Sequence, residues 1–184
     1  MREPAGSVVL TYREYAALPA DGRRYEIHDG ELSVTPAPSP QHQRIVRNLC
    51  LVLQVHVTAH HLGEVLPSPL DVILSDTVIV QPDLVYLETL RLGAISHRGV
   101  EGPPTLVVEV LSPSTVLADR TTKRQLYARY RVPFYWLVDP EARAVEVLQL
   151  GPGGYELILR ATGASAIHPA PFADLALIPD DLWP

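Results

Sequence analysis

Two acidic side chains stand in strand-like apolar segments. Asp83 follows Gln81-Pro82 and opens the segment 84–87, and Glu109 lies 26 residues later within the apolar run 106–111. A strand this hydrophobic is expected to be buried on both faces, where a carboxylate is costly unless it pairs with a cation or binds a metal. If the two strands are neighbours, both carboxylates meet at one edge of a sheet and favour a cation between them. The alternatives are a turn aspartate after proline and a glutamate paired with an arginine.

Two carboxylates with open coordination positions beside them suit Mg²⁺ or Mn²⁺, which prefer oxygen ligands. Such an ion activates water and stabilises negative charge on a phosphoryl group, and phosphodiester hydrolysis needs both effects. The pattern therefore indicates a metal-dependent phosphodiesterase with Asp83 and Glu109 as ligands.

The chain contains fourteen arginines and a single lysine, Lys123. In such a chain a cation with no special role would most often be an arginine. An ammonium group is a compact charge that can orient a water molecule and a phosphate, whereas a guanidinium group is wide and planar. Lys123 is therefore a candidate for the site, and the alternative is a lysine on a solvated helix face.

Three further side chains are candidates of second rank. Glu26 lies in a predicted hairpin strand and could supply another metal-site or water-orienting carboxylate, or pair with Arg24 at the surface. His42 lies in the first turn of a predicted helix, where it could hydrogen-bond a phosphate or a carboxylate. The alternative for His42 is a partly buried structural histidine. Asp71, in the predicted strand 70–74, could also approach the site.

The elements that must position these groups follow from local patterns. A capping box over Thr11–Glu14 predicts a short helix to about Leu18, and Asp29-Gly30 predicts a hairpin turn. A 3.6-residue apolar stripe, with Ser39 as N-cap, predicts a helix over 40–61. We predict strands over 24–28, 31–35, 64–66, 70–74, 78–81, 83–87, 106–111, 134–138, 145–150 and 155–160, a second long helix over 116–131, a surface loop over 88–104 and a short segment over 172–177.

The order helix, three strands, helix, strand predicts a mixed central sheet between helices, which is an α/β fold with β-hairpins added at the N- and C-terminal ends. We expect one domain over 1–184, with a core at about 40–140, an N-terminal helix and hairpin at 11–35 and a C-terminal hairpin and tail at 144–184. The net charge of −6 argues against a wholesale nucleic-acid coat. Cys50, the only cysteine, excludes a disulfide framework and a cysteine-based zinc site.

No stretch approaches the ~20 apolar residues of a membrane span, and the N-terminus lacks the apolar core of a secretory signal. We therefore expect a cytoplasmic protein without a membrane partner.

Several segments resemble a known family. Pro82-Asp83 followed by Glu109-Val-Leu111 resembles the PD-(D/E)xK nuclease superfamily, and longer segments resemble its Uma-two family of restriction endonucleases over about residues 11–150. These longer segments are 24–32, 39–42, 107–114, 119–123 and 135–139. The resemblance implies a restriction-endonuclease-like core, a DNA endonuclease that uses Mg²⁺ or Mn²⁺, and a homodimer.

One position departs from the superfamily pattern, because the lysine expected two residues after Glu109 is Leu111. The family resemblance implies that Lys123, on the next helix, takes the role of that lysine. Lys123 would then orient the attacking water and offset charge, and the backbone carbonyl of Val110 would help Asp83 and Glu109 to bind the metal.

Arginines on the two long helices are expected to grip DNA phosphates, contacts that carry no sequence information. They are Arg44, Arg47, Arg120 and Arg124. Leu111 also supports an alternative, a catalytically inactive nucleic-acid-binding module on the same fold. A second alternative is a protein-interaction module in which the carboxylates only form buried salt bridges.

Overall fold

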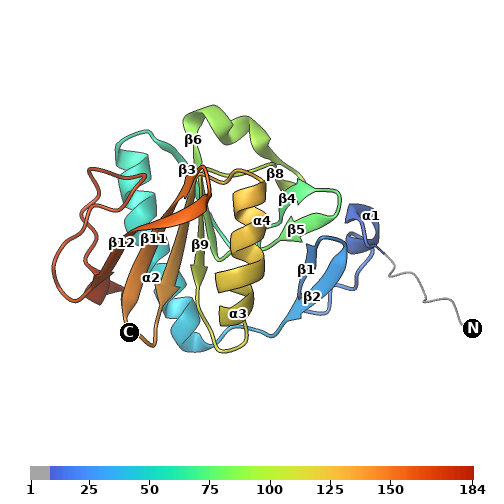
Figure 1. Cartoon of the computed structure of the whole chain (residues 1–184), viewed down its shortest axis with the longest axis horizontal. Coiled ribbons are helices and arrows are strands. Elements are labelled where there is room, and N and C mark those ends of the chain that lie inside the picture. The colour runs from blue at the N-terminus through green and yellow to red at the C-terminus, as the bar shows by residue number, and fades with distance from the viewer. Residues whose placement is uncertain (1–8) are drawn as a thin grey trace, which may run out of the picture.

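The computed structural model describes residues 9–184, which form two six-stranded sheets (Figure 1). The larger one, here the main sheet, has its parallel pair, β9 and β10, at the centre, and its other neighbouring strands are antiparallel. Its strands, in spatial order, are β12 (Gly154–Thr162), β11 (Ala144–Gly151), β10 (Phe134–Asp139), β9 (Leu106–Val110), β6 (Leu84–Glu88) and β3 (Gly63–Pro67).

Helices cover both faces of the main sheet. The crossover between β9 and β10 is helical and consists of α3 (Val116–Ala118), the π-helical turn η2 (Asp119–Lys123) and α4 (Arg124–Arg129). The other face is covered by α2 (Pro40–Ala59), which begins at Ser39, where the hydroxyl accepts the N–H of His42 at 3.2 Å. Proline in the first turn of α2 needs no hydrogen-bond partner, so the cap and Pro40 together define where the helix starts.

The alternation of side chains along β9 decides which face Glu109 occupies. Val108 and Val110 pack in the core beneath α2, whereas Val107 and Leu111 pack in the core beneath α4. Because successive side chains of a strand point to opposite faces, Glu109 lies on the α4 side.

The smaller N-terminal sheet lies beside α4 (Figure 1). Its strands, in spatial order, are β2 (Glu31–Thr35), β1 (Arg24–His28), β5 (Val78–Val80), β4 (Val72–Ser75), β8 (Gly99–Glu101) and β7 (Ile95–Ser96). Asp29 and Gly30 both have positive φ, +54° and +85°, so the predicted hairpin turn is confirmed. The short helix α1 (Tyr12–Tyr15) contributes Tyr12 and Tyr15 to the outer face of this sheet.

Several predicted elements are wrong in detail. The helix predicted from 11 to about 18 ends at Tyr15. The segment predicted as a surface loop contains the 3₁₀-helix η1 (Thr89–Ala94) and the strands β7 and β8, and β8 pairs in parallel with β4. Such short strands depend on backbone pairing with distant residues, which a side-chain pattern does not reveal.

The C-terminal part also differs. Within the short segment expected at 172–177, Leu177 makes an isolated bridge with Ile167. Phe172 is nevertheless buried against α2 and the main sheet, and a 3₁₀-helix, η3 (Pro179–Leu182), follows. None of the described helices is long and apolar enough to span a bilayer.

Candidate active site

The antiparallel pairing of β6 with β9 brings Asp83 and Glu109 to one edge of the main sheet. Leu84 pairs with Val108, so Asp83, one residue earlier, lies next to Glu109, one residue later. Both side chains line the same pocket, here called the reaction pocket, which has a volume of about 240 Å³. Both are only 2% exposed. The predicted convergence of the two carboxylates is therefore present in the fold.

Asp83 is held as a carboxylate by a hydrogen-bonding shell. Its Oδ2 accepts the backbone N–H of Val110 at 2.8 Å, and its Oδ1 lies 3.2 Å from Nη1 of Arg24. His42 reaches in from the first turn of α2, with Nε2 3.2 Å from Asp83 Oδ2 and 2.9 Å from the Val110 carbonyl oxygen. Burial opposes ionisation of Asp83, but the His42 hydrogen bond and the charge of Arg24 outweigh it and lower the pKa of Asp83.

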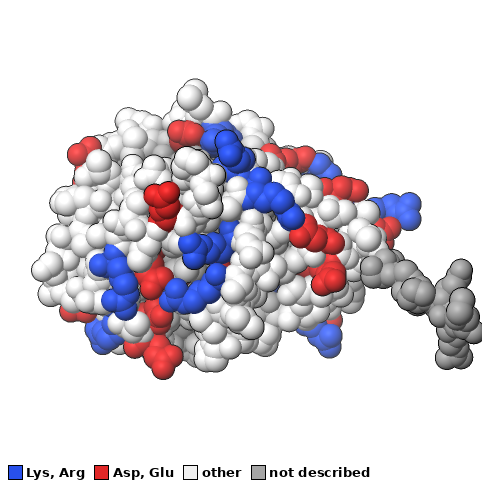
Figure 2. Space-filling view, in the orientation of Figure 1, with Lys and Arg blue, Asp and Glu red and all other residues white. Residues whose placement is uncertain are grey.

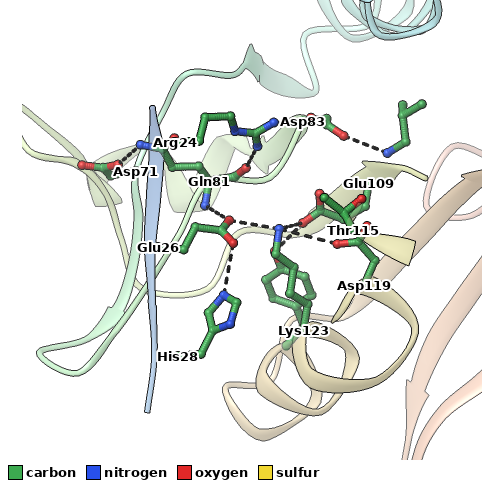
Figure 3. A network of polar contacts seen from close by, with 12 residues as sticks. Arg24, Glu26, His28, Asp71, Gln81, Asp83, Glu109, Thr115, Asp119 and Lys123 are labelled. Carbon is green, nitrogen blue, oxygen red and sulfur yellow. Dashed lines mark hydrogen bonds and ion pairs between the residues drawn. The ribbon is translucent and has the colours of Figure 1, made fainter. Parts of the chain in front are cut away.

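Lys123 lies at the centre of the remaining carboxylates and is 4% exposed (Figure 3). Its Nζ is 3.0 Å from Oε1 of Glu109, 3.0 Å from Oε1 of Glu26 and 3.6 Å from Oδ1 of Asp119. Burial disfavours the ammonium form, but these carboxylates outweigh burial and raise the pKa of Lys123. The structure thus excludes a lysine on a solvated helix face, and the group in the pocket is a protonated ammonium.

The π turn η2 presents one face of the crossover helix to Glu109. Asp119 and Lys123, both buried, bound this turn, and Tyr127 follows four residues later and donates its hydroxyl to Glu109 Oε1 at 2.8 Å. π-helical turns within helices are frequent at functional sites. Leu111, at the position where the superfamily has lysine, is 5% exposed and packs in the core beneath α4. The ammonium therefore approaches Glu109 from the helix, not from the strand.

Glu26 is part of the same network and does not pair with Arg24 at the surface. It is 2% exposed; its Oε1 accepts the backbone N–H of Gln81 at 2.7 Å, and its Oε2 lies 3.1 Å from Nε2 of His28. Burial would raise the pKa of Glu26, but the Lys123 ammonium outweighs it, so the pKa is lowered. Arg24 instead donates to the carbonyl of Gln81 and to Asp83. Strand β1 therefore contributes Arg24 to the surroundings of Asp83 and Glu26 to the surroundings of Lys123.

Asp71 lies outside the reaction pocket. Its Oδ1 accepts the hydroxyl of Tyr15 at 2.6 Å and the side-chain N–H of Gln81 at 2.8 Å. Gln81 thus links Asp71, through its side chain, to Glu26, through its backbone N–H. Asp71 therefore helps to hold the turn before Asp83 but does not line the pocket.

The buried charges around the pocket do not balance. Four carboxylates, each at most 2% exposed, face two fixed cations, Arg24 and Lys123. With all four carboxylates ionised, and with the neighbouring His28 and His42 neutral, two negative charges are in excess. The carboxylates are Glu26, Asp83, Glu109 and Asp119. Burial raises the pKa of Glu109 well above its ordinary value, although Lys123 opposes this, and burial likewise raises the pKa of Asp119. The site must either retain protons or accept a compensating cation.

The donor set fits a hard divalent cation. Within residues 9–184 no group of three or more His, Cys, Asp or Glu side chains is spaced to hold a metal ion. A Mg²⁺ site, however, needs only one or two carboxylates, because the ion retains several water molecules. Asp83, Glu109 and the carbonyl of Val110 supply oxygen donors of this kind, and the excess charge of the pocket matches that of one divalent cation.

The four arginines expected at phosphates lie away from the reaction pocket. Arg120 is 2.8 Å from Glu146 and 3.2 Å from Asp139, and Arg124 donates to the carbonyl of Tyr155 at 2.7 Å. Arg44 and Arg47 are exposed on α2. The face seen in Figure 2 shows basic side chains next to acidic ones rather than a continuous basic surface.

Sequence reasoning missed two groups that contact the site, Asp119 and Tyr127. The four-residue spacing of Asp119, Lys123 and Tyr127 was a usable signal, since side chains spaced in this way share a helix face. The partners of Arg24 had no such signal, because they come from a distant strand.

Comparison with known proteins gives a match to a family model and matches among solved structures. The sequence model of the Uma2 family, described as "Putative restriction endonuclease", matches residues 12–178. Among solved structures, one described as "a putative nuclease belonging to DUF820 from Anabaena variabilis ATCC 29413" has a TM-score of 0.78 and 21% sequence identity, and covers 94% of this chain and 97% of that one. At this identity the likeness establishes the fold. A search of curated proteins found no match.

Proposed function

The chain belongs to the Uma2 family, and on that premise we propose that it is a Mg²⁺- or Mn²⁺-dependent endonuclease that hydrolyses DNA phosphodiester bonds. The observation that supports the metal dependence is the cluster of four buried carboxylates at the pocket, which faces only two fixed cations and carries two excess negative charges when all four are ionised. Such an excess is costly at neutral pH, and a divalent cation removes it and supplies Lewis-acid chemistry to a phosphate.

Asp83, Glu109 and the Val110 carbonyl are the proposed ligands. When bound, the ion polarises the phosphoryl group and lowers the pKa of a water molecule. Asp83 is prepared for this role because its lowered pKa keeps it a carboxylate. Glu109 receives both Lys123 and Tyr127 on Oε1, which leaves Oε2 as its ligand atom. His42 is a positioning residue that contacts Asp83 Oδ2 and the Val110 carbonyl together.

Lys123 is the proposed donor to water and phosphate. Because its pKa is raised, it stays protonated and cannot be the group that accepts the proton of the attacking water. A fixed ammonium in a water-poor pocket stabilises charge that develops on a phosphate in the transition state. Glu26 and Asp119 hold the ammonium in position without lying on the strand that carries Glu109.

Isothermal titration calorimetry with Mn²⁺, combined with nicking of supercoiled plasmid, tests this proposal. We expect one Mn²⁺ site and Mn²⁺-dependent nicking in the wild type, and loss of both in Asp83→Asn. Asp71→Asn is the matched control, because Asp71 is a hydrogen-bonded aspartate outside the pocket, and it should retain both properties. A wild type that neither binds Mn²⁺ nor nicks plasmid refutes the proposal.

A second candidate function is a catalytically inactive DNA-binding module on the same fold. The observation that favours it is the pairing of Glu109 Oε1 with Lys123 and of Asp83 Oδ1 with Arg24, which engages one oxygen of each proposed ligand with a cation of the chain itself. This candidate predicts DNA binding without Mn²⁺-dependent cleavage. We also propose that the protein acts as a homodimer, which sedimentation-velocity centrifugation of the purified chain measures directly.

A further inference from the structure

The reaction pocket is small and its acidic groups are deep. It is walled on one side by the end of β2 and the segment 36–39 that follows it, and on the other by the segment 112–115, which precedes α3. Asp83, Glu109 and Lys123 are each less than 5% exposed at the base of this volume of about 240 Å³. A phosphate must therefore enter between the two walls in order to meet them.

A second pocket of about 430 Å³ continues from the first over the start of α2. The two pockets share Ser39, His42, Ser112 and Pro113 as lining residues. Its remaining wall is partly apolar, formed by Leu111, Val116 and Pro140, and partly polar, formed by Gln41, Asp139 and Glu141. The two volumes together form a trough that runs from the acidic centre to the turn after β10.

The chemistry of the two pockets differs. The first contains two cations, Arg24 and Lys123, and a hydroxyl cluster in which Ser112 Oγ is 3.0 Å from Ser114 Oγ and 3.0 Å from Thr115 Oγ1. These groups donate to a phosphate. In the second pocket Asp139 is bonded to Arg120 and to the backbone N–H groups of Glu141 and Ala142, which leaves the exposed carboxylate of Glu141 at the rim. A carboxylate accepts hydrogen bonds from base amino groups, and an apolar wall suits the flat face of a base.

Duplex DNA does not suit this trough. In a duplex a second strand lies across a groove about 6 to 12 Å wide from each phosphate. Binding of a duplex therefore needs cations on the protein surface that neutralise the phosphates of both strands. Arg120 and Arg124, which lie on the crossover helix, are tied to Glu146, Asp139 and the Tyr155 carbonyl. Neither they nor Arg44 and Arg47 line either pocket.

We infer that the substrate enters as a single unpaired DNA strand, with the scissile phosphate in the reaction pocket and the base of an adjacent nucleotide in the second pocket. The inference rests on the proposed nuclease function. It narrows the substrate to single-stranded DNA or to duplex DNA with locally unpaired nucleotides.

Cleavage of three labelled DNA substrates in Mn²⁺ tests the inference. They are a single-stranded 20-mer, the fully paired duplex of the same sequence, and that duplex with a three-nucleotide bulge. We expect the single strand and the bulged duplex to be cut at least about tenfold faster than the paired duplex, the size of one lost base contact. Equal rates on all three overturn the inference and leave the nuclease function intact.

Absence of cleavage on all three, as well as on plasmid, removes the proposed function. In that case, the affinities for the single strand and for the paired duplex are compared by fluorescence anisotropy without divalent ions, because the trough does not depend on the ion. Binding of the single strand that is no tighter than binding of the duplex overturns the inference in that case too.

A pair of variants on α2 tests the second pocket. Gln41 lines it, whereas Gln43 is exposed near the same helix end and lines neither pocket. We expect Gln41→Trp to raise KM for the single strand about tenfold with little change in kcat, because the indole fills the place of the base. Gln43→Trp should leave both constants unchanged. Equal effects of the two variants, or none for Gln41→Trp, contradict the assignment of this pocket to a base.

Discussion

Replacing Lys123 with methionine isolates what the ammonium contributes to the fold. Methionine has a similar length but no charge, so Glu26, Glu109 and Asp119 lose the cation that lies 3.0, 3.0 and 3.6 Å from them. Removing one partner of a buried ion pair costs about 3 to 5 kcal/mol. For a domain of this size each kcal/mol lowers Tm by about 2 to 4 °C, so we expect Tm to fall by about 6 to 20 °C.

The loss should depend on pH in a defined direction. In Lys123→Met, the pKa values of Glu109 and Asp119, which burial already raises, rise further because the ammonium that opposes burial is gone. Glu26 loses the ammonium that lowers its pKa and keeps only His28 and the Gln81 N–H. A carboxyl group whose pKa is raised by folding destabilises the fold as pH increases, because it must be ionised while buried. The variant should therefore be most destabilised at pH 8 and recover part of its stability at pH 5.

Urea unfolding followed by circular dichroism, with EDTA present at both pH values, measures this free energy. Gln125→Met is the control, because Gln125 is exposed on the same helix and its replacement should change stability by less than about 0.5 kcal/mol. The reasoning is refuted if Lys123→Met is as stable as the control, or if its loss is the same at pH 5 and pH 8.

Three further predictions follow from the same site. Lys123→Arg keeps the positive charge but not the compact ammonium donor, so we expect the cleavage rate to fall by about 10²-fold or more while DNA binding is retained. Cleavage at the wild-type rate would exclude Lys123 as the donor to water and phosphate. Burial raises the pKa of Glu109, so binding of Mn²⁺ should release a proton from this carboxyl group. We therefore expect calorimetry to show a lower Kd for Mn²⁺ at pH 8 than at pH 6, and a Kd independent of pH contradicts this. Ser39→Ala removes the acceptor for the N–H of His42 and should cost about 1 kcal/mol, seen as a fall in Tm of about 2 to 4 °C; an unchanged Tm contradicts the role of Ser39 as the cap of α2.

Much of the frame that positions the site was predictable from sequence. Ser39-Pro40 and the apolar stripe after it define α2, and Asp29-Gly30 defines the β1–β2 turn, because both signals are local. The meeting of Asp83 and Glu109 was predicted on the condition that their two apolar strands are neighbours, and the pairing of β6 with β9 meets that condition.

The rest depends on contacts between distant segments. That Glu26 is buried against Lys123 follows from the packing of β1 against the crossover helix, and no local pattern distinguishes it from an exposed strand residue. The partners of Arg120 are Asp139 and Glu146, which come from the far end of β10 and from β11. The register of those strands, and not the charge of Arg120, determines whether this arginine is free to meet DNA.

The position of Lys123 also affects how such a site can be recognised from sequence. Glu109 and Lys123 belong to different elements, a central strand and a π-helical turn, yet their charged atoms are 3.0 Å apart. The distance between these two atoms is set by the packing of the crossover helix on β9 and not by a short spacing in the sequence, whereas Leu111, two residues after Glu109, packs in the core. A search for an acidic residue followed two positions later by lysine would classify this chain as degenerate. Relatives of this kind are better recognised by asking which buried cation the acidic strand faces.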